Sequence, residues 1–167
     1  MNIKRFSALL LAFVMIFALA ACSDNTGDGN SDGNSDTAVV DIETVKETII
    51  SELSVTDARS LDSSRLLDLY GIKEEDVTAS ACFVTMNAIF PDEVIMVNAV
   101  NKDKAQEIAE MLQTHLDAVK VQSQSYDAEN YAIAQKCEVM TEGLTVALFL
   151  SPDQEAMVEI FNRIAEK

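Results

Sequence analysis

The sequence is poor in the residue types that common catalytic and phosphate-binding motifs require. Its 167 residues include one histidine, three cysteines and five glycines. Three glycines lie in one polar tract, which leaves only Gly71 and Gly143, so a glycine-rich loop that cradles phosphate is not expected. The single histidine, His115, lies in no H-E-x-x-H pattern, and the chain has no G-x-S-x-G motif. These absences predict a non-enzymatic protein without catalytic residues, a cofactor or a bound metal.

Basic residues are also scarce. The chain has 12 lysines and arginines against 28 aspartates and glutamates, which gives a formal net charge of −16 at pH 7. Nucleic-acid binding depends on Lys and Arg contacts with phosphate, so a nucleic-acid partner is not expected. The same excess of acid disfavours direct electrostatic adhesion to anionic lipid. The simplest role for this many acids is a well-hydrated, soluble surface.

Residues 1–21 are predicted to be a lipoprotein signal peptide. Lys4 and Arg5 precede the apolar run Ala8–Ala18, which is too short for a membrane-spanning helix of about 20 residues. The next residues, Leu19–Cys22 (L-A-A-C), resemble the lipobox of bacterial lipoproteins, in which the cysteine thiol receives a diacylglyceryl group. An ordinary secretory signal or an uncleaved anchor is the alternative. We expect Cys22 to be the lipidation site, which would anchor the protein on the extracytoplasmic face of the cell membrane.

Residues 22–37 are predicted to be a linker. Apart from the cysteine, they are all Ser, Asp, Asn, Gly or Thr, a composition typical of a flexible coil. Within the linker, Asp28–Gly33 matches the opening of an EF-hand calcium loop. That loop requires a bidentate acid at its twelfth position, which here is Val39. A specific calcium site is therefore not expected.

Residues 38–167 have the length of one domain, and their apolar spacing predicts four helices. Each helix follows a residue that can cap its N-terminus, and the second ends at Gly71, a residue type common just after a helix. The last has Pro152 at its first position and Gln154 completing a capping box with Ser151. The expected helices follow Asp41, Asp62, Asn101 (to about Val121) and Ser151.

Four strands are predicted from runs of apolar and β-branched residues. They cover residues 77–86, 93–100, 133–140 and 144–150. The resulting order is ββαββα after two N-terminal helices. Helices placed on one face of an antiparallel sheet give an α+β fold with two layers, which is the expected architecture.

Two cysteines remain outside the leader, and two interpretations of them are open. Cys82 and Cys137 fall in the first and third predicted strands of an exported domain, where a disulfide can form. Their neighbours are apolar, which equally suits free cysteines that pack as small hydrophobic residues. The sequence does not decide between these two states.

Several short motifs resemble the uncharacterised domain-of-unknown-function family 4358, found in lipoproteins of Gram-positive bacteria. The resemblance spans about residues 39–167, although Leu144 stands where the family usually has an aromatic residue. It implies a surface location and domain limits, and no functional residues, because the family has no established activity. The motifs are Leu69-Tyr70-Gly71-Ile72, Glu75-Asp76-Val77, Asp92-Glu93-Val94-Ile95 and Gly143-Leu144-Thr145-Val146.

The function expected from these features is a binding or interaction module that recognises an envelope protein or a small extracellular ligand. The alternative is an unrecognised enzyme that acts on cell-envelope material. Ile89 and Phe90, in the first hairpin loop, and Tyr126 and Tyr131 form the candidate interaction patch, unless they fold back onto the core. His115 is expected to be a boundary residue without function, and the adjacent acids Asp92-Glu93 are expected to face water.

Overall fold

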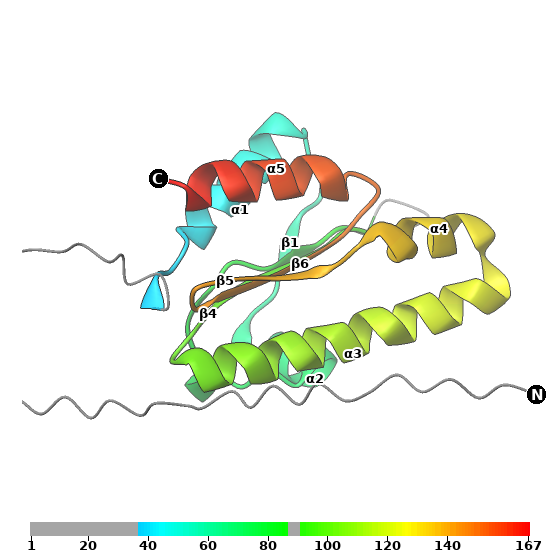
Figure 1. The fold of residues 1–167 in the computed structure, drawn as a ribbon. Helices are drawn as coiled ribbons and strands as arrows, with labels where there is room; N and C mark the ends of the chain where they lie inside the picture. The colour runs from blue at the N-terminus through cyan, green and yellow to red at the C-terminus, as the bar shows by residue number, and fades with distance from the viewer. Residues whose placement is uncertain (1–36, 87–90) are drawn as a thin grey trace, which may run out of the picture. The chain divides into compact units, whose positions relative to one another are not determined.

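The computed structural model describes residues 37–86 and 91–167, and these residues form an antiparallel sheet between two layers of helices (Figure 1). The strands are β1 (Arg59–Ser60), β2 (Val77–Ser80), β3 (Phe83–Val84), β4 (Glu93–Ala99), β5 (Val139–Glu142) and β6 (Thr145–Leu150). The helices are α1 (Ile42–Glu52), α2 (Ser63–Tyr70), the 3₁₀ helix η2 (Glu74–Asp76), α3 (Lys102–Tyr126), α4 (Ala128–Lys136) and α5 (Gln154–Ala165).

The centre of the sheet is the antiparallel pair β4 and β6. Glu93 pairs with Leu150 at one end of this ladder, and Asn98 pairs with Thr145 at the other. On the outer side of β6 lies β5. Along the other side of β4 lie β2 and β3, one after the other, and β1 pairs with β3.

Both faces of the sheet are buried, because β4 and β6 send alternate side chains into two separate cores. Ile95 and Val97 pack against α2, α3 and α4, whereas Val94 and Met96 pack against α1 and α5. The mixed helix-and-strand class predicted from the sequence is confirmed. The two-layer arrangement and the four-strand ββαββα order are wrong, since helices cover both faces and the described residues contain six strands.

The third predicted strand is the largest error in element assignment. Residues 128–136 form α4, and only Val139–Glu142 extends as β5. The Asp127 carboxylate accepts hydrogen bonds from the backbone N–H groups of Glu129 and Asn130, which starts the helix. The fully buried Ala134 joins the core on the α3 side of the sheet, so tertiary packing completes what the cap begins.

The first predicted strand is divided, and the short strand β1 was missed. Residues Ala81 and Cys82 interrupt the run between β2 and β3, and the register of β2 on β4 shifts after Val77. The start of α5 also differs from the prediction. Its N-cap is Asp153, whereas the Ser151 hydroxyl accepts from the Asp153 N–H at 3.0 Å and donates to Asp92.

The other helix caps are confirmed. Asp41, Asp62 and Asn101 each accept a hydrogen bond from a backbone N–H three residues ahead. Hydrogen bonds from Thr44 lower the pKa of Asp41, and the backbone N–H of Arg65 lowers the pKa of Asp62. Gly71 closes α2 in the left-handed conformation, with φ of 77°.

The residues just before α1 are held against one end of the sheet by polar contacts. The Ala38 carbonyl accepts from the Leu144 N–H at 2.8 Å, and the Val40 N–H donates to the Thr145 hydroxyl at 2.8 Å. The Thr145 hydroxyl in turn donates to Asn98 Oδ1 at 2.7 Å, and Asn98 Nδ2 donates to the Val40 carbonyl at 3.2 Å. The chain therefore enters the sheet where β4 ends and β6 begins.

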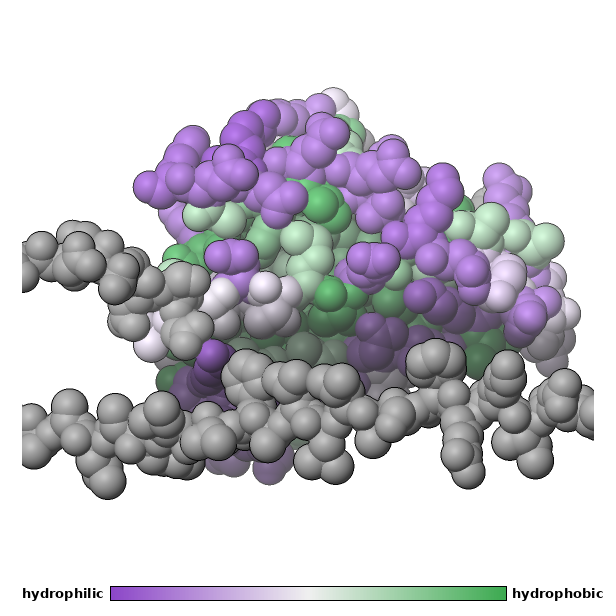
Figure 2. All heavy atoms as spheres, in the orientation of Figure 1, coloured by the Kyte–Doolittle hydropathy of each residue, from purple (hydrophilic) through white to green (hydrophobic). Residues whose placement is uncertain are grey.

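Polar residues cover the outer surface of the layer that contains α5, and hydrophobic residues show in the band below it (Figure 2). This distribution agrees with a helix that turns Met157, Ile160 and Phe161 toward the sheet. In the described residues, no helix is both long enough and apolar enough to cross a membrane.

Cys82 and Cys137 are free, buried thiols, with Cys82 in the break between β2 and β3 and Cys137 just after α4. The Cys82 thiol donates to the Met96 carbonyl, and the Cys137 thiol donates to the Ile133 carbonyl. Burial raises the pKa of Cys82 to about 11 from its ordinary value of 9.0, and it also raises that of Cys137.

The raised pKa of Cys82 predicts a loss of stability in alkali. Because the folded pKa lies above the unfolded one, the stabilisation is complete below pH 9 and is lost as the pH rises toward 11. The shift corresponds to about 2 to 3 kcal/mol. Urea unfolding of the wild type and of Cys82→Ala between pH 8 and pH 11 measures it, since the variant should lose less stability over this range. Identical pH slopes in the two proteins would contradict the prediction.

Candidate functional site

Three side chains from three elements meet at one end of the sheet. Glu93 is the first residue of β4, Tyr70 is the last residue of α2, and His115 lies on α3. The Tyr70 hydroxyl donates to Glu93 Oε2 at 3.0 Å, and His115 Nε2 lies 2.8 Å from the same oxygen. The rings of Tyr70 and His115 meet edge to face, with centroids 4.8 Å apart. We call these three residues the Glu93 cluster.

Local sequence explains how the cluster is positioned. Tyr70 precedes Gly71, whose left-handed conformation ends α2 and leaves the tyrosine ring packed against the core. His115 lies three residues from Leu112 and one from Leu116, so it is at the rim of the buried stripe of α3. The side chains of His115 and Glu93 retain 24% and 25% exposure, respectively, which keeps this contact within reach of solvent.

The Tyr70 hydroxyl is fixed as a hydrogen-bond donor. Burial raises its pKa well above the ordinary value, and the neighbouring Glu93 carboxylate adds to this effect. The phenol therefore stays protonated at neutral pH and orients the carboxylate. Both contacts within the cluster use Oε2, and among the described residues neither of these hydrogen bonds engages Oε1.

A pocket of about 320 Å³ opens beside the Glu93 cluster. It lies between the start of β4, the end of β6, the C-terminal part of α3 and the start of α4. Glu93 and Tyr126 both line this pocket, and Tyr126 is 89% exposed. The lining residues are Pro91, Glu93, Val119, Gln122, Ser123, Tyr126, Asp127, Asn130 and Leu150.

The wall of this pocket is rich in hydrogen-bond acceptors. It carries the carboxylates of Glu93 and Asp127, and its lining includes no lysine or arginine. Asp127 Oδ1 is engaged in capping α4, which holds that side chain in place. An anionic ligand is disfavoured here, and groups that donate hydrogen bonds or carry positive charge are favoured.

The residues of the predicted interaction patch lie in different places, and their binding role stays a prediction. Tyr126 lines the pocket beside Glu93. Tyr131 lies on α4, where its hydroxyl accepts from Gln135 Nε2 at 2.8 Å, and it is not among the residues that line this pocket. Ile89 and Phe90 lie outside the described residues, and so does the predicted lipidation site Cys22.

The Glu93 cluster was not predicted from the sequence. His115 was expected to be a boundary residue without function, but its carboxylate partner Glu93 lies on a strand, 22 residues away along the chain. The expectation that Asp92 and Glu93 simply face water is wrong. Asp92 accepts hydrogen bonds from the hydroxyls of Thr85 and Ser151, which joins the start of β4 to the turn before α5.

Among residues 37–86 and 91–167, no three His, Cys, Asp or Glu side chains come together as a set that could hold a metal ion. No curated protein and no solved structure matches the chain. One family model does match, over residues 51–151, a range shorter at both ends than the resemblance drawn from the sequence. This range includes the whole Glu93 cluster and Tyr126. The chain belongs to the family described as "Domain of unknown function (DUF4358)".

Proposed function

We propose that this protein is a lipid-anchored binding module on the extracytoplasmic face of the cell membrane. Residues 1–21 act as its signal peptide, Cys22 carries the lipid, and the rest of residues 22–37 link the anchor to the domain of residues 38–167. The domain binds a small extracellular ligand, or one side chain of an envelope protein, in the pocket beside Glu93. The observation that carries the binding role is the Glu93 carboxylate, held by two partners, in the wall of a pocket that also has an exposed aromatic ring.

The position of the pocket supports this role. The chain enters the domain beside Asn98 and Thr145, whereas the pocket lies beside Glu93 and Leu150. These pairs are opposite ends of the β4–β6 ladder, which are about 17 Å apart along a strand of this length. The pocket therefore lies at the end of the sheet opposite the point where residues 38–40 join it.

Removing the proposed lipidation site tests the anchor. The variant Cys22→Ala should leave the membrane fraction, or accumulate as an unprocessed precursor, because no thiol remains to accept the diacylglyceryl group. Cell fractionation and intact-protein mass spectrometry of both proteins measure the two outcomes. A variant with the partitioning of the wild type and an unchanged lipid mass would refute lipidation at Cys22.

A ligand screen tests the binding role. Differential scanning calorimetry of the full chain, in detergent, with amines, amino acids, sugars, wall fragments and divalent ions should identify a stabilising ligand. A ligand at 100 times its dissociation constant adds about 2.7 kcal/mol to the free energy of unfolding.

Matched variants locate the binding site. Glu93→Gln and Tyr126→Ala should each abolish the stabilisation by that ligand, because both residues line the pocket. The variant Tyr131→Ala should retain the stabilisation, because this substitution removes a tyrosine ring of the same size from α4, outside the pocket. Stabilisation that survives both pocket variants would place the site elsewhere, and a screen without any hit would argue for a macromolecular partner.

The contact between His115 and Glu93 favours one second candidate, an enzyme that acts on cell-envelope material. A histidine hydrogen-bonded to a carboxylate beside a pocket is an arrangement that can transfer protons. Mass spectrometry of wall fragments incubated with the protein tests this alternative. Products that form with the wild type and not with His115→Gln would show that the protein is an enzyme. Fragments that stay unchanged with the wild type would favour the binding module.

A further inference from the structure

The outer edge of the sheet beside β2 is an open position for another strand. β1 runs antiparallel along the outside of β3, and the Leu61 N–H continues this pairing to the Cys82 carbonyl. The chain then leaves the sheet, because α2 begins at Ser63. Within the described residues, β2 pairs with β4 on one side only. β1 fills the strand position on the outer side of β3, and we call this position the lane. The lane continues beside β2, where no strand of the described residues fills it.

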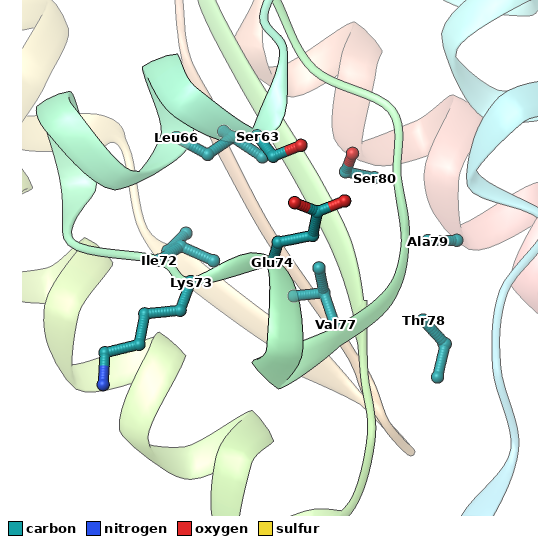
Figure 3. Close-up of a pocket in the computed structure, with 9 residues that line it drawn as sticks. All are labelled: Ser63, Leu66, Ile72, Lys73, Glu74, Val77, Thr78, Ala79 and Ser80. Carbon is teal, nitrogen blue, oxygen red and sulfur yellow. The ribbon is translucent and has the colours of Figure 1, made fainter.

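A pocket of about 200 Å³ lies in this lane (Figure 3). All four residues of β2, Val77–Ser80, line it, together with residues of α2 and of the segment around η2. Neighbouring side chains of a strand point to opposite faces, so a pocket lined by four consecutive residues lies against the strand edge. The backbone N–H and C=O groups along that edge are the ones that another strand would pair with.

The chemistry of the pocket selects for a basic side chain. Its apolar wall includes the buried residues Leu66 and Ile72, and the Glu74 carboxylate lies between Ser63 and Ser80 (Figure 3). Lys73 points away from this carboxylate in the same view and forms an ion pair with Glu75 at 3.8 Å. With respect to the described residues, the Glu74 side chain has neither a hydrogen bond nor an ion pair, so it is free to meet a cation.

We propose that the edge of β2 docks an extended basic peptide segment of a partner protein. The segment adds as a strand beside β2, in the lane that β1 vacates, and inserts one lysine or arginine side chain into the pocket toward Glu74. Backbone pairing supplies the affinity, and the pocket supplies the preference for a basic residue. The net charge of −16 favours the approach of such a partner. This site shares no lining residue with the pocket beside Glu93, so it stands apart from the ligand site proposed above.

Nuclear magnetic resonance of the isotope-labelled full chain in detergent, titrated with a short peptide of alternating threonine and lysine, tests this proposal. Amide signals of Thr78, Ala79 and Ser80 should shift, and hydrogen exchange should slow at Ser80. The Ser80 N–H faces the free edge, because the next N–H, that of Ala81, donates to the Met96 carbonyl on β4 and successive N–H groups of a strand point to opposite sides. The variant Glu74→Lys should weaken binding about tenfold or more. The variant Glu47→Lys makes the same change of charge on the exposed side of α1 and should bind as the wild type does.

Two further peptides separate strand pairing from general attraction. A peptide with glutamate in place of lysine should not bind, and a lysine peptide with N-methylated backbone should lose binding although it keeps every charge. Equal binding of the N-methylated peptide would overturn strand pairing, and an equal loss in Glu47→Lys and Glu74→Lys would overturn the role of the pocket. A protein dimer that forms through β2 and excludes the peptide would also overturn the proposal, since a second copy would then be the occupant.

Discussion

Replacing Gly143 with alanine is expected to lower the free energy of unfolding by about 2 to 4 kcal/mol. Gly143 has φ of 57°, a left-handed conformation that a residue with a Cβ adopts only under strain. An added Cβ would also lie 2.2 Å from the Ala38 carbonyl oxygen, so the backbone would have to move. That carbonyl accepts the Leu144 N–H, and movement would weaken this bond as well. Urea unfolding of the two proteins measures the difference.

Gly71 provides the matched control. It is also left-handed, with φ of 77°, but an added Cβ would meet nothing closer than Met111 Sδ at 3.8 Å. The variant Gly71→Ala should therefore show only the backbone strain, about 1 to 2 kcal/mol. Equal losses of stability in the two variants would mean that the close approach of Ala38 contributes nothing.

The local features of this fold were predictable because short-range chemistry determines them. Asp41, Asp62 and Asn101 start helices through bonds to their own next turn, and Gly71 ends one through its own backbone conformation. None of these features depends on distant parts of the chain. In contrast, the helix α4 depends on packing against α3 through Ala134, and the sequence there carries an apolar run that also suits a strand.

The sequence carries a signal for helices on both faces of the sheet. Residues 94–97 and 146–150 are continuously apolar, whereas a strand with one face in water alternates apolar and polar residues. Continuous runs indicate strands buried on both faces, and β4 and β6 are buried in this way. An expectation of helices on both sides would have followed.

The Glu93 cluster could not be predicted from the sequence, for a different reason. Its members are separated by 23 and 22 residues along the chain, and they meet only because α2 and α3 cover the same face of the sheet. Nothing in the residues around Tyr70 or His115 identifies the other partner. The family membership, in contrast, was recognisable from short motifs, and the match over residues 51–151 confirms it.

Replacing Thr145 with valine is expected to cost about 2 to 6 kcal/mol of stability, although the two side chains have nearly the same shape. The fully buried Thr145 hydroxyl donates to Asn98 Oδ1 and accepts from the Val40 N–H. Valine removes both bonds and leaves a buried acceptor and a buried donor unsatisfied, at about 1 to 3 kcal/mol each. The variant Thr145→Ser keeps the hydroxyl and should lose only the smaller contribution of one methyl group, about 1 kcal/mol.

A double-mutant cycle of Thr145→Val and Gly143→Ala shows whether these contacts act together. Thr145 holds Val40, and the tight turn at Gly143 admits Ala38, so both residues position the segment that joins the domain to its proposed linker. Once one substitution has released residues 38–40, the second substitution has fewer contacts of these residues to break. The combined loss of stability in urea unfolding should therefore fall below the sum of the single losses by at least about 0.5 kcal/mol. Additive losses would show that residues 38–40 are held by two independent contacts.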